Sequence, residues 1–168
     1  EGEMDNTDFL LLRSMPKLKY IDLSGLTNTT LPPSVFKGMQ SLMELDLPKN
    51  LEEIPFAMCQ DCNSLKKVFP IPKSVKIIGD NAFNYCTSMD TELPLHEGIT
   101  YIGMYAFDGC YELKGDLVLP STLKTLEGHC NFRNCWNMDK VYIKIAKPLD
   151  VWGDEKFPNY NYLGVPIG

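Results

Sequence analysis

Cysteine and histidine are the residues of this sequence whose spacing most directly suggests chemistry. The 168 residues include six cysteines and two histidines. The stretch Cys59–Cys62 has the Cys-x2-Cys spacing of many zinc sites, and Cys130 with Cys135 would supply the other half of a tetrahedral site. This hypothesis depends on whether the fold brings the two halves together.

Catalytic residues do not stand out in the sequence. Neither His96 nor His129 has a serine or cysteine and a carboxylate at a spacing typical of a nucleophile, a base and an orienting acid. The sequence also has no glycine-rich loop of the kind that binds phosphate. We therefore expect no catalytic residue, no cofactor and no enzymatic activity, although a triad assembled in space from distant segments stays open.

Charge and hydropathy exclude two classes of partner. The formal net charge of −6 argues against a nucleic-acid surface, which needs clustered lysine and arginine. Because the sequence has no apolar run of about 18 residues or more, we expect no membrane-spanning segment. The stretch Asn28-Thr29-Thr30 has the form of a glycosylation sequon, which we interpret as turn chemistry in a polar loop while leaving its modification open.

An internal repeat of 24 residues organises the whole chain. Its first element is a pair of large apolar residues separated by one outward position, the alternation of a strand with one buried face. The predicted strands lie at 21–23, 45–47, 69–71, 93–95, 117–119, 141–143 and, as a further possibility, 165–167. Stacked units of this kind share one continuous core.

The rest of each unit keeps the same register. A second apolar pair follows the strand, as at Val75 and Ile78, and then come a phenylalanine and a cysteine, as at Phe83 and Cys86. Asp80 is placed to cap a helix that runs through these last residues. Each unit is therefore predicted to form a strand, an extended return and one or two turns of helix, in an α/β right-handed solenoid with a parallel sheet on one side.

The repeat changes the interpretation of the cysteines. Cys62, Cys86, Cys110 and Cys135 occupy one position of the unit, so we predict a column of small buried side chains. Cys62 and Cys135 are three units apart, about 14 Å at the spacing of neighbouring strands, which is too far for one zinc ion. Parallel side chains in such a column do not converge to form disulfides. Cys130, in a one-residue insertion, could reach Cys135 or stay free.

The combined motif resembles the BspA-like, or Treponema-type, leucine-rich repeat of bacterial surface proteins. The segments Leu65–Cys86 and Met89–Cys110 match its pattern almost throughout, and the stretch from Phe157 to Gly168 resembles its closing segment. The resemblance implies one leucine-rich-repeat domain over 1–168 with about six units, a partial unit at 5–18 and a closing unit at 144–168. It also implies an extracellular or cell-surface location and binding to a protein or glycan.

Two functions follow as alternatives. The first is a non-catalytic, adhesin-type binding module, and the second is a structural spacer within a larger surface protein. An adhesin should display exposed aromatic residues on the sheet face, whereas a spacer should not. The ligand itself stays open, because solenoids place recognition on variable outward positions.

The candidate binding residues are the outward positions of the predicted strands. They are Tyr20, Asp22, Glu44, Asp46, Glu92, His96, Asp116, Lys140, Tyr142 and Lys144. The first units are acidic, whereas the last is basic and aromatic, which predicts a partner whose encounter depends on charge. The two tyrosines are expected to act as rigid, amphipathic anchors.

Overall fold

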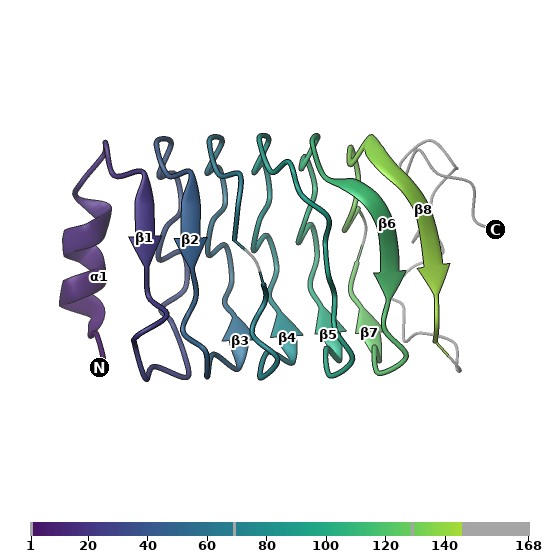
Figure 1. The fold of residues 1–168 in the computed structure, drawn as a ribbon, viewed down its shortest axis with the longest axis horizontal. Helices are drawn as coiled ribbons and strands as arrows, with labels where there is room; N and C mark the ends of the chain where they lie inside the picture. The colour runs from purple at the N-terminus through teal and green to yellow at the C-terminus, as the bar shows by residue number, and fades with distance from the viewer. Residues whose placement is uncertain (1, 69, 129, 146–168) are drawn as a thin grey trace.

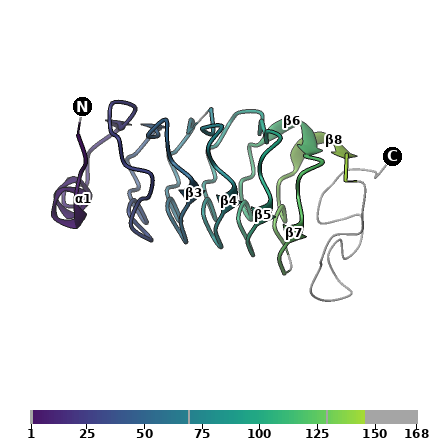
Figure 2. The same ribbon diagram turned by 90° about the horizontal axis from the view of Figure 1, so that it is seen from below.

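The computed structural model describes residues 2–68, 70–128 and 130–145. Successive repeat units form the rungs of a solenoid and stack along its long axis (Figure 1). We use the word rung for one 24-residue turn of this solenoid. Two rows of strands run along the stack, one near the start of the rungs and the other after the first bend (Figures 1 and 2).

Helix α1 (Asn6–Arg13) lies at the N-terminal end of the stack, within the segment predicted as a partial unit. Asp5 begins it with a capping box, because its side chain accepts from the backbone N–H groups of Thr7 and Asp8 while the Asp8 carboxylate accepts from the Asp5 N–H. Phe9 is the buried residue of the helix, and its ring meets that of Phe36 edge to face at 6.4 Å. The helix thereby covers the first end of the apolar core.

The first row of strands contains β1 (Tyr20–Asp22), β2 (Glu44–Asp46), β6 (Lys114–Leu119) and β8 (Asn137–Ile143). All pairings are parallel: β1 pairs with β2, and β6 with β8. The apolar residues of the predicted pairs are buried at the described positions, except for Ile143, which is 46% exposed. Phe69 and the possible strand 165–167 lie outside the described residues.

The first row is interrupted between β2 and β6, which contradicts the predicted strands at 69–71 and 93–95. Residues 70–71 and 93–95 have no strand conformation, and the described residues of the rung after β2 pair with β2 through one bridge, between Glu44 and Lys67. Pro70 and Pro94 occupy the centre of these two segments, where proline cannot donate to a neighbouring strand. The alternation of buried and exposed residues is therefore kept in these rungs, whereas the hydrogen-bonded strand ladder is absent from their described residues.

The second row is a four-stranded parallel sheet in the order β3, β4, β5, β7. Its strands are β3 (Glu53–Ile54), β4 (Ile77–Ile78), β5 (Tyr101–Ile102) and β7 (Thr125–Leu126). They occupy the segment predicted as an extended return. Directly after β5, a Cβ atom on Gly103 would lie 2.5 Å from the Asp80 nitrogen and 2.7 Å from the Gly79 carbon. A glycine is therefore needed for the rungs to approach this closely.

The predicted helices after the second row are wrong, because these segments form stacked turns. Asn81 and Tyr85 both have positive φ, 56° and 57°, and the same spacing of four recurs in the neighbouring rungs. The N–H groups of Asn81, Phe83 and Tyr85 donate to carbonyls of the next rung, each at 2.8 Å. A helix needs those donors for its own carbonyls, so bonding between rungs replaces helical bonding.

Aromatic rings and thiols fill the core behind these turns. Phe107 stacks on Phe83 at 5.4 Å and on Phe132 at 5.5 Å, with nearly parallel planes. The Phe107 side chain is fully buried. Because the repeat places the same residue type at the same height of each rung, the stack continues from one unit to the next.

Candidate functional site

The cysteine column has a structural role. The Sγ–H groups of Cys62, Cys86, Cys110 and Cys135 donate to carbonyls of the preceding rung at 2.9–3.2 Å. Burial raises the pKa of the Cys59, Cys86, Cys110 and Cys135 thiols well above the ordinary value, which keeps them protonated. This geometry confirms the predicted column of buried side chains. Among the described residues, no group of three or more His, Cys, Asp or Glu side chains is arranged to hold a metal ion.

An ion pair between buried Asp108 and partly exposed Arg133 also belongs to the framework. Asp108 is 1% exposed, and its two carboxylate oxygens accept from Arg133 Nε at 3.1 Å and Nη2 at 2.6 Å. The carboxylate raises the pKa of the Arg133 guanidinium above its ordinary range. The guanidinium carbon lies 5.7 Å from the Tyr105 ring centroid, so the charge is held between a carboxylate and an aromatic face. These contacts join neighbouring turns rather than forming a cleft.

Asn28, the first residue of the possible sequon, is used within the fold. Its side-chain oxygen accepts from the Met4 N–H and its Nδ2 donates to the Met4 carbonyl, both at 3.0 Å. The amide thereby holds the segment before α1 against the first rung.

The strand face is the surface formed by the outward side of β1, β2, β6 and β8 and of the segments 67–68, 70–72 and 91–96 between them. It carries all ten predicted binding residues. Nine of them are exposed, and His96 is half-buried. The predicted residues are therefore spread along the first row of strands and the segments between them, from β1 to the end of β8, and Figure 1 shows the order of these strands along the stack.

At the β1–β2 end, acidic residues lie beside one another. Asp22 is directly opposite Asp46 in the strand register, and Tyr20 is opposite Glu44. The Ser24 backbone N–H donates to the Asp22 carboxylate at 2.8 Å, and hydrogen bonding from Ser24 lowers the pKa of Asp22. Like charges directly across a strand pair are unfavourable, so this end of the face favours a cationic neighbour.

At the β6–β8 end, residues of opposite charge face each other in the strand register without forming an ion pair in the described structure. Asp116 is opposite Lys140, and Val118 is opposite Tyr142, whose side chain is 45% exposed. A register shift between Gly115 and Asp116 leaves Asp139 as the extra residue of β8. Exposed tyrosines thus occupy both ends of the strand face, at Tyr20 and Tyr142, without forming one patch.

The interruption between β2 and β6 leaves two hollows in the strand face. We call the first the proline hollow; it has a volume of about 500 Å³. It is lined by Ser24, Leu45, Asp46, Leu47, Lys49, Val68, Pro70, Ile71, Pro72, Lys73, Pro94 and His96. Its apolar floor is part of the core, while two lysines, an aspartate and the histidine surround it. The strand face therefore carries basic residues next to β2 as well as in β8.

His96 joins two rungs inside the proline hollow. Its Nε2 lies 3.0 Å from the Pro72 carbonyl oxygen, and its Nδ1 lies 3.0 Å from the Glu97 carbonyl oxygen. Both neighbours are acceptors, so a neutral imidazole donates to one of them and a protonated imidazole to both. The side chain supplies a link between rungs where Pro94 provides no backbone donor.

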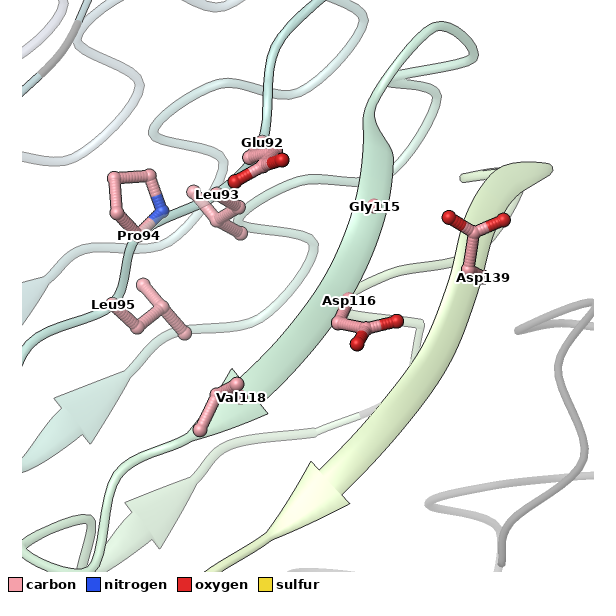
Figure 3. Close-up of a pocket in the computed structure, with 8 residues that line it drawn as sticks. All are labelled: Glu92, Leu93, Pro94, Leu95, Gly115, Asp116, Val118 and Asp139. Atoms are coloured by element: carbon pink, nitrogen blue, oxygen red, sulfur yellow. The ribbon is translucent and has the colours of Figure 1, made fainter.

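We call the second hollow the acidic hollow; it has a volume of about 450 Å³. It is lined by Glu92, Leu93, Pro94, Leu95, Gly115, Asp116, Val118 and Asp139. The carboxylates of Glu92, Asp116 and Asp139 surround the start of β6 (Figure 3). Within the described chain, the two ion pairs are Lys114–Asp90 and Arg133–Asp108, so none of these three carboxylates is in an ion pair.

A row of aromatic side chains lies apart from the hollows, beside the turns that lead into β6 and β8. Tyr111 stacks on Trp136 at 4.9 Å and meets Tyr85 edge to face at 6.5 Å. Trp136 is 60% exposed. Sequence reasoning expected exposed aromatics on the sheet face and did not identify this row.

Sequence reasoning also missed the two hollows and Asp139. The signal was present in Pro70 and Pro94, which lie between the two apolar residues of a predicted strand. A proline at that position removes a ladder hydrogen bond and predicts a gap in the sheet. The position of Asp139 could not be predicted, because the pattern of buried residues alone does not reveal a β-bulge.

Stacked parallel strands with a leucine-rich core define this class of protein as a leucine-rich-repeat solenoid. The family model for the BspA type leucine-rich repeat region, with six copies, matches residues 8–90 and 89–164, and the chain belongs to this family. Its members are associated with bacterial surfaces, are typically protein-interaction modules and are generally non-catalytic.

Two solved structures are similar to the chain. A leucine-rich-repeat protein of T. pallidum has a TM-score of 0.62 and 20% identity, with 86% of this chain and 74% of that chain covered. A leucine-rich-repeat protein of Bacteroides ovatus has a TM-score of 0.45 and 19% identity, with 86% of this chain and 49% of that chain covered. The first likeness supports the fold alone. The comparison with curated proteins found no match.

Among the described residues, α1 is the one α-helix, and its 8 residues are too few to cross a bilayer.

Proposed function

We propose that the chain is an adhesin-type binding module of a bacterial surface protein and that the strand face binds its ligand, a protein or glycan. The observation that carries this proposal is the interruption of the first row of strands. It leaves hollows of about 500 and 450 Å³ side by side, sharing Pro94 in their linings. Both volumes lie within the range of about 300–1,000 Å³ that is usual for ligand pockets.

The composition of the strand face supports binding rather than a purely structural role. A spacer needs only a solvated outer surface, whereas this face combines apolar floors with charged rims and exposed tyrosines. Tyr20 and Tyr142 are 60% and 45% exposed. Tyrosine is enriched at the centres of protein interfaces because it is rigid and has both an apolar ring and a polar hydroxyl. An extended face of this kind suits a protein or polymer better than a small molecule.

The proposal is tested by a binding screen followed by matched variants. The purified domain is screened against extracellular matrix proteins and a glycan array, and each ligand is titrated by biolayer interferometry. Asp46→Lys and Tyr142→Ala on the strand face are compared with Glu52→Lys and Phe56→Ala beside the second row of strands. The second pair makes similar changes at exposed positions, because Phe56 is 49% exposed and Glu52 is also exposed.

We expect Asp46→Lys or Tyr142→Ala to weaken binding about tenfold, the effect of losing about 1.4 kcal/mol. The two control variants should stay within about twofold of the unaltered domain. A ligand that is lost through Glu52→Lys or Phe56→Ala and retained by the strand-face variants would show that another surface binds it. A screen without any ligand would favour the spacer alternative.

A further inference from the structure

The edge of β6 that faces the acidic hollow is open. The Lys144 N–H donates to the Leu119 carbonyl at 3.2 Å, so the backbone of Leu119 is directed toward β8. Neighbouring residues of a strand direct their backbone N–H and C=O groups to opposite sides. The backbone groups of Asp116 and Val118 therefore face the segment 92–95. The same alternation occurs in β2, one of whose residues bonds toward β1 and the next toward the following rung.

The segment 92–95 does not pair with this edge. Pro94 has no N–H group, and the Leu95 N–H donates to the carbonyl of Leu93 within its own segment at 2.9 Å. In the described chain, the one backbone hydrogen bond between residues 91–95 and β6 is donated by the Lys114 N–H to the Thr91 carbonyl, at the first residue of β6. The backbone groups of Asp116 and Val118 consequently line the acidic hollow without a partner strand.

The charge around this open edge is negative. Glu92, Asp116 and Asp139 line the hollow, and none of the lysines or arginines that the structure describes lines it. Lys140 is opposite Asp116 in the register but forms no ion pair with it in the described structure. The absence of a side chain at Gly115 lets the Glu92 side chain lie close to β6, since a Cβ atom at Gly115 would lie 2.9 Å from the Cγ atom of Glu92.

We propose that the acidic hollow binds an extended segment of a partner protein that carries arginine or lysine at alternate positions. The main chain of this segment pairs with Asp116 and Val118, and so adds a short strand to the edge of β6. Its basic side chains contact the carboxylates of Asp116 and Asp139, which arginine can bind in a bidentate way. This inference rests on the proposed function, because it specifies a partner for part of the strand face.

The test uses a fluorescein-labelled peptide in which arginine and valine alternate over seven residues, and the whole 168-residue chain. Anisotropy is measured at low ionic strength, where attraction between exposed charges is least screened. We expect saturable binding that Asp116→Asn and Asp139→Asn each weaken about three- to fivefold, the usual limit for one exposed charge pair. Glu52→Gln, which removes one negative charge from an exposed position beside the second row of strands, should leave the affinity within about twofold.

Two N-methylated peptides separate strand pairing from simple charge attraction. Each carries N-methyl groups on one alternate set of residues, so one peptide loses the donors that face β6 and the other loses those that face away. We expect one of the two to bind at least about tenfold more weakly and the other to retain affinity. In NMR spectra, the amides of Asp116 and Val118 should shift most on binding of the parent peptide.

Three results would overturn the inference: no binding of the arginine peptide, equal binding of a peptide with glutamate in place of arginine, or equal binding of both N-methylated peptides. These failures are distinct from failure of the proposed function. A ligand from the screen that still depends on Asp46 and Tyr142 would keep the strand face as a binding surface while removing the peptide site at β6.

Discussion

At the scale of single residues, the core depends on side chains that recur at the same height of successive rungs. Phe83, Phe107 and Phe132 illustrate this, because each ring is buried against the equivalent ring of its neighbour. A ring in the middle of the column has aromatic contacts on both faces. Its removal leaves a cavity that the rigid rungs on either side cannot close.

Phe107→Ala is expected to lower the free energy of unfolding by about 3–5 kcal/mol, the usual cost of deleting a buried aromatic side chain. The measurement is urea unfolding followed by circular dichroism. Phe56→Ala is the control, since Phe56 is 49% exposed and its loss should cost less than about 1 kcal/mol. A loss below about 1 kcal/mol for Phe107→Ala would contradict its position in the core.

The buried thiols predict a loss of stability in alkaline solution. Burial raises the pKa of Cys86 and Cys110 in the folded chain, whereas the unfolded chain has the ordinary pKa of about 8.5. The contribution of these thiols to the free energy of unfolding is therefore fully present below about pH 8.5, and it is lost as the pH rises toward their pKa in the folded chain. We expect the free energy of unfolding to fall between about pH 8 and pH 10.

The control for this prediction is the double variant Cys86→Ala/Cys110→Ala. It should be less stable at neutral pH, because the alanines leave small cavities, but its stability should fall less steeply with rising pH. An identical slope in both proteins would mean that tyrosine or lysine titration causes the alkaline loss.

At the scale of elements, the close approach of neighbouring rungs determines which secondary structure each segment adopts. The turns after the second row use left-handed residues and donate alternate N–H groups to the next rung, and this excludes a helix. In the second row, Gly103 N donates to Ile78 O at 2.8 Å, which brings two backbones into direct contact. The glycine is required by this contact rather than by an unusual φ.

Gly103→Ala should destabilise the fold by about 1–3 kcal/mol, because the added methyl group lies within 2.7 Å of backbone atoms in the neighbouring rung. Gly25→Ala is the matched control, since a Cβ atom there has no neighbour within 4 Å. The control should be neutral or slightly stabilising through reduced freedom of the unfolded chain. Equal melting temperatures for the two variants would contradict the close packing described at Gly103.

At the scale of the whole molecule, each rung is stabilised mainly by its two neighbours. Solenoids of this kind have stabilities that are approximately sums of unit and interface terms, so protection depends on position along the stack. The first rung is covered on its outer side by α1, whose buried contact is Phe9. A single helix replaces a full rung there.

Amide exchange should therefore be faster in the first rung than in the middle of the stack. The Leu23 amide, which donates to Asp46 O at 2.8 Å, is expected to exchange more rapidly than the Gly103 amide, which donates to Ile78 O at the same distance. The measurement is native-state hydrogen exchange by NMR. Equal protection of the two amides would indicate that the solenoid opens as one cooperative unit.

The sequence by itself determined the repeat length, the residues that face the core and the face that carries the candidate binding residues. Ile21, Leu45 and Leu117 alternate with outward positions, and burial of apolar side chains selects one register for such a pattern. The cysteine column followed from the same reasoning, because residues at one position of a repeat must lie at the same height of each rung.

Only the tertiary structure decided how the backbone groups of neighbouring rungs are paired. The apolar pattern at 93–95 is that of a strand, but Pro94 and the bond between Leu95 and Leu93 leave the edge of β6 open. The turn at Asn81–Tyr85 has apolar residues at helical spacing, yet its donors bond to the next rung. Side-chain periodicity reports which face is buried, whereas hydrogen bonding between rungs depends on neighbours that the repeat brings together from 24 residues away.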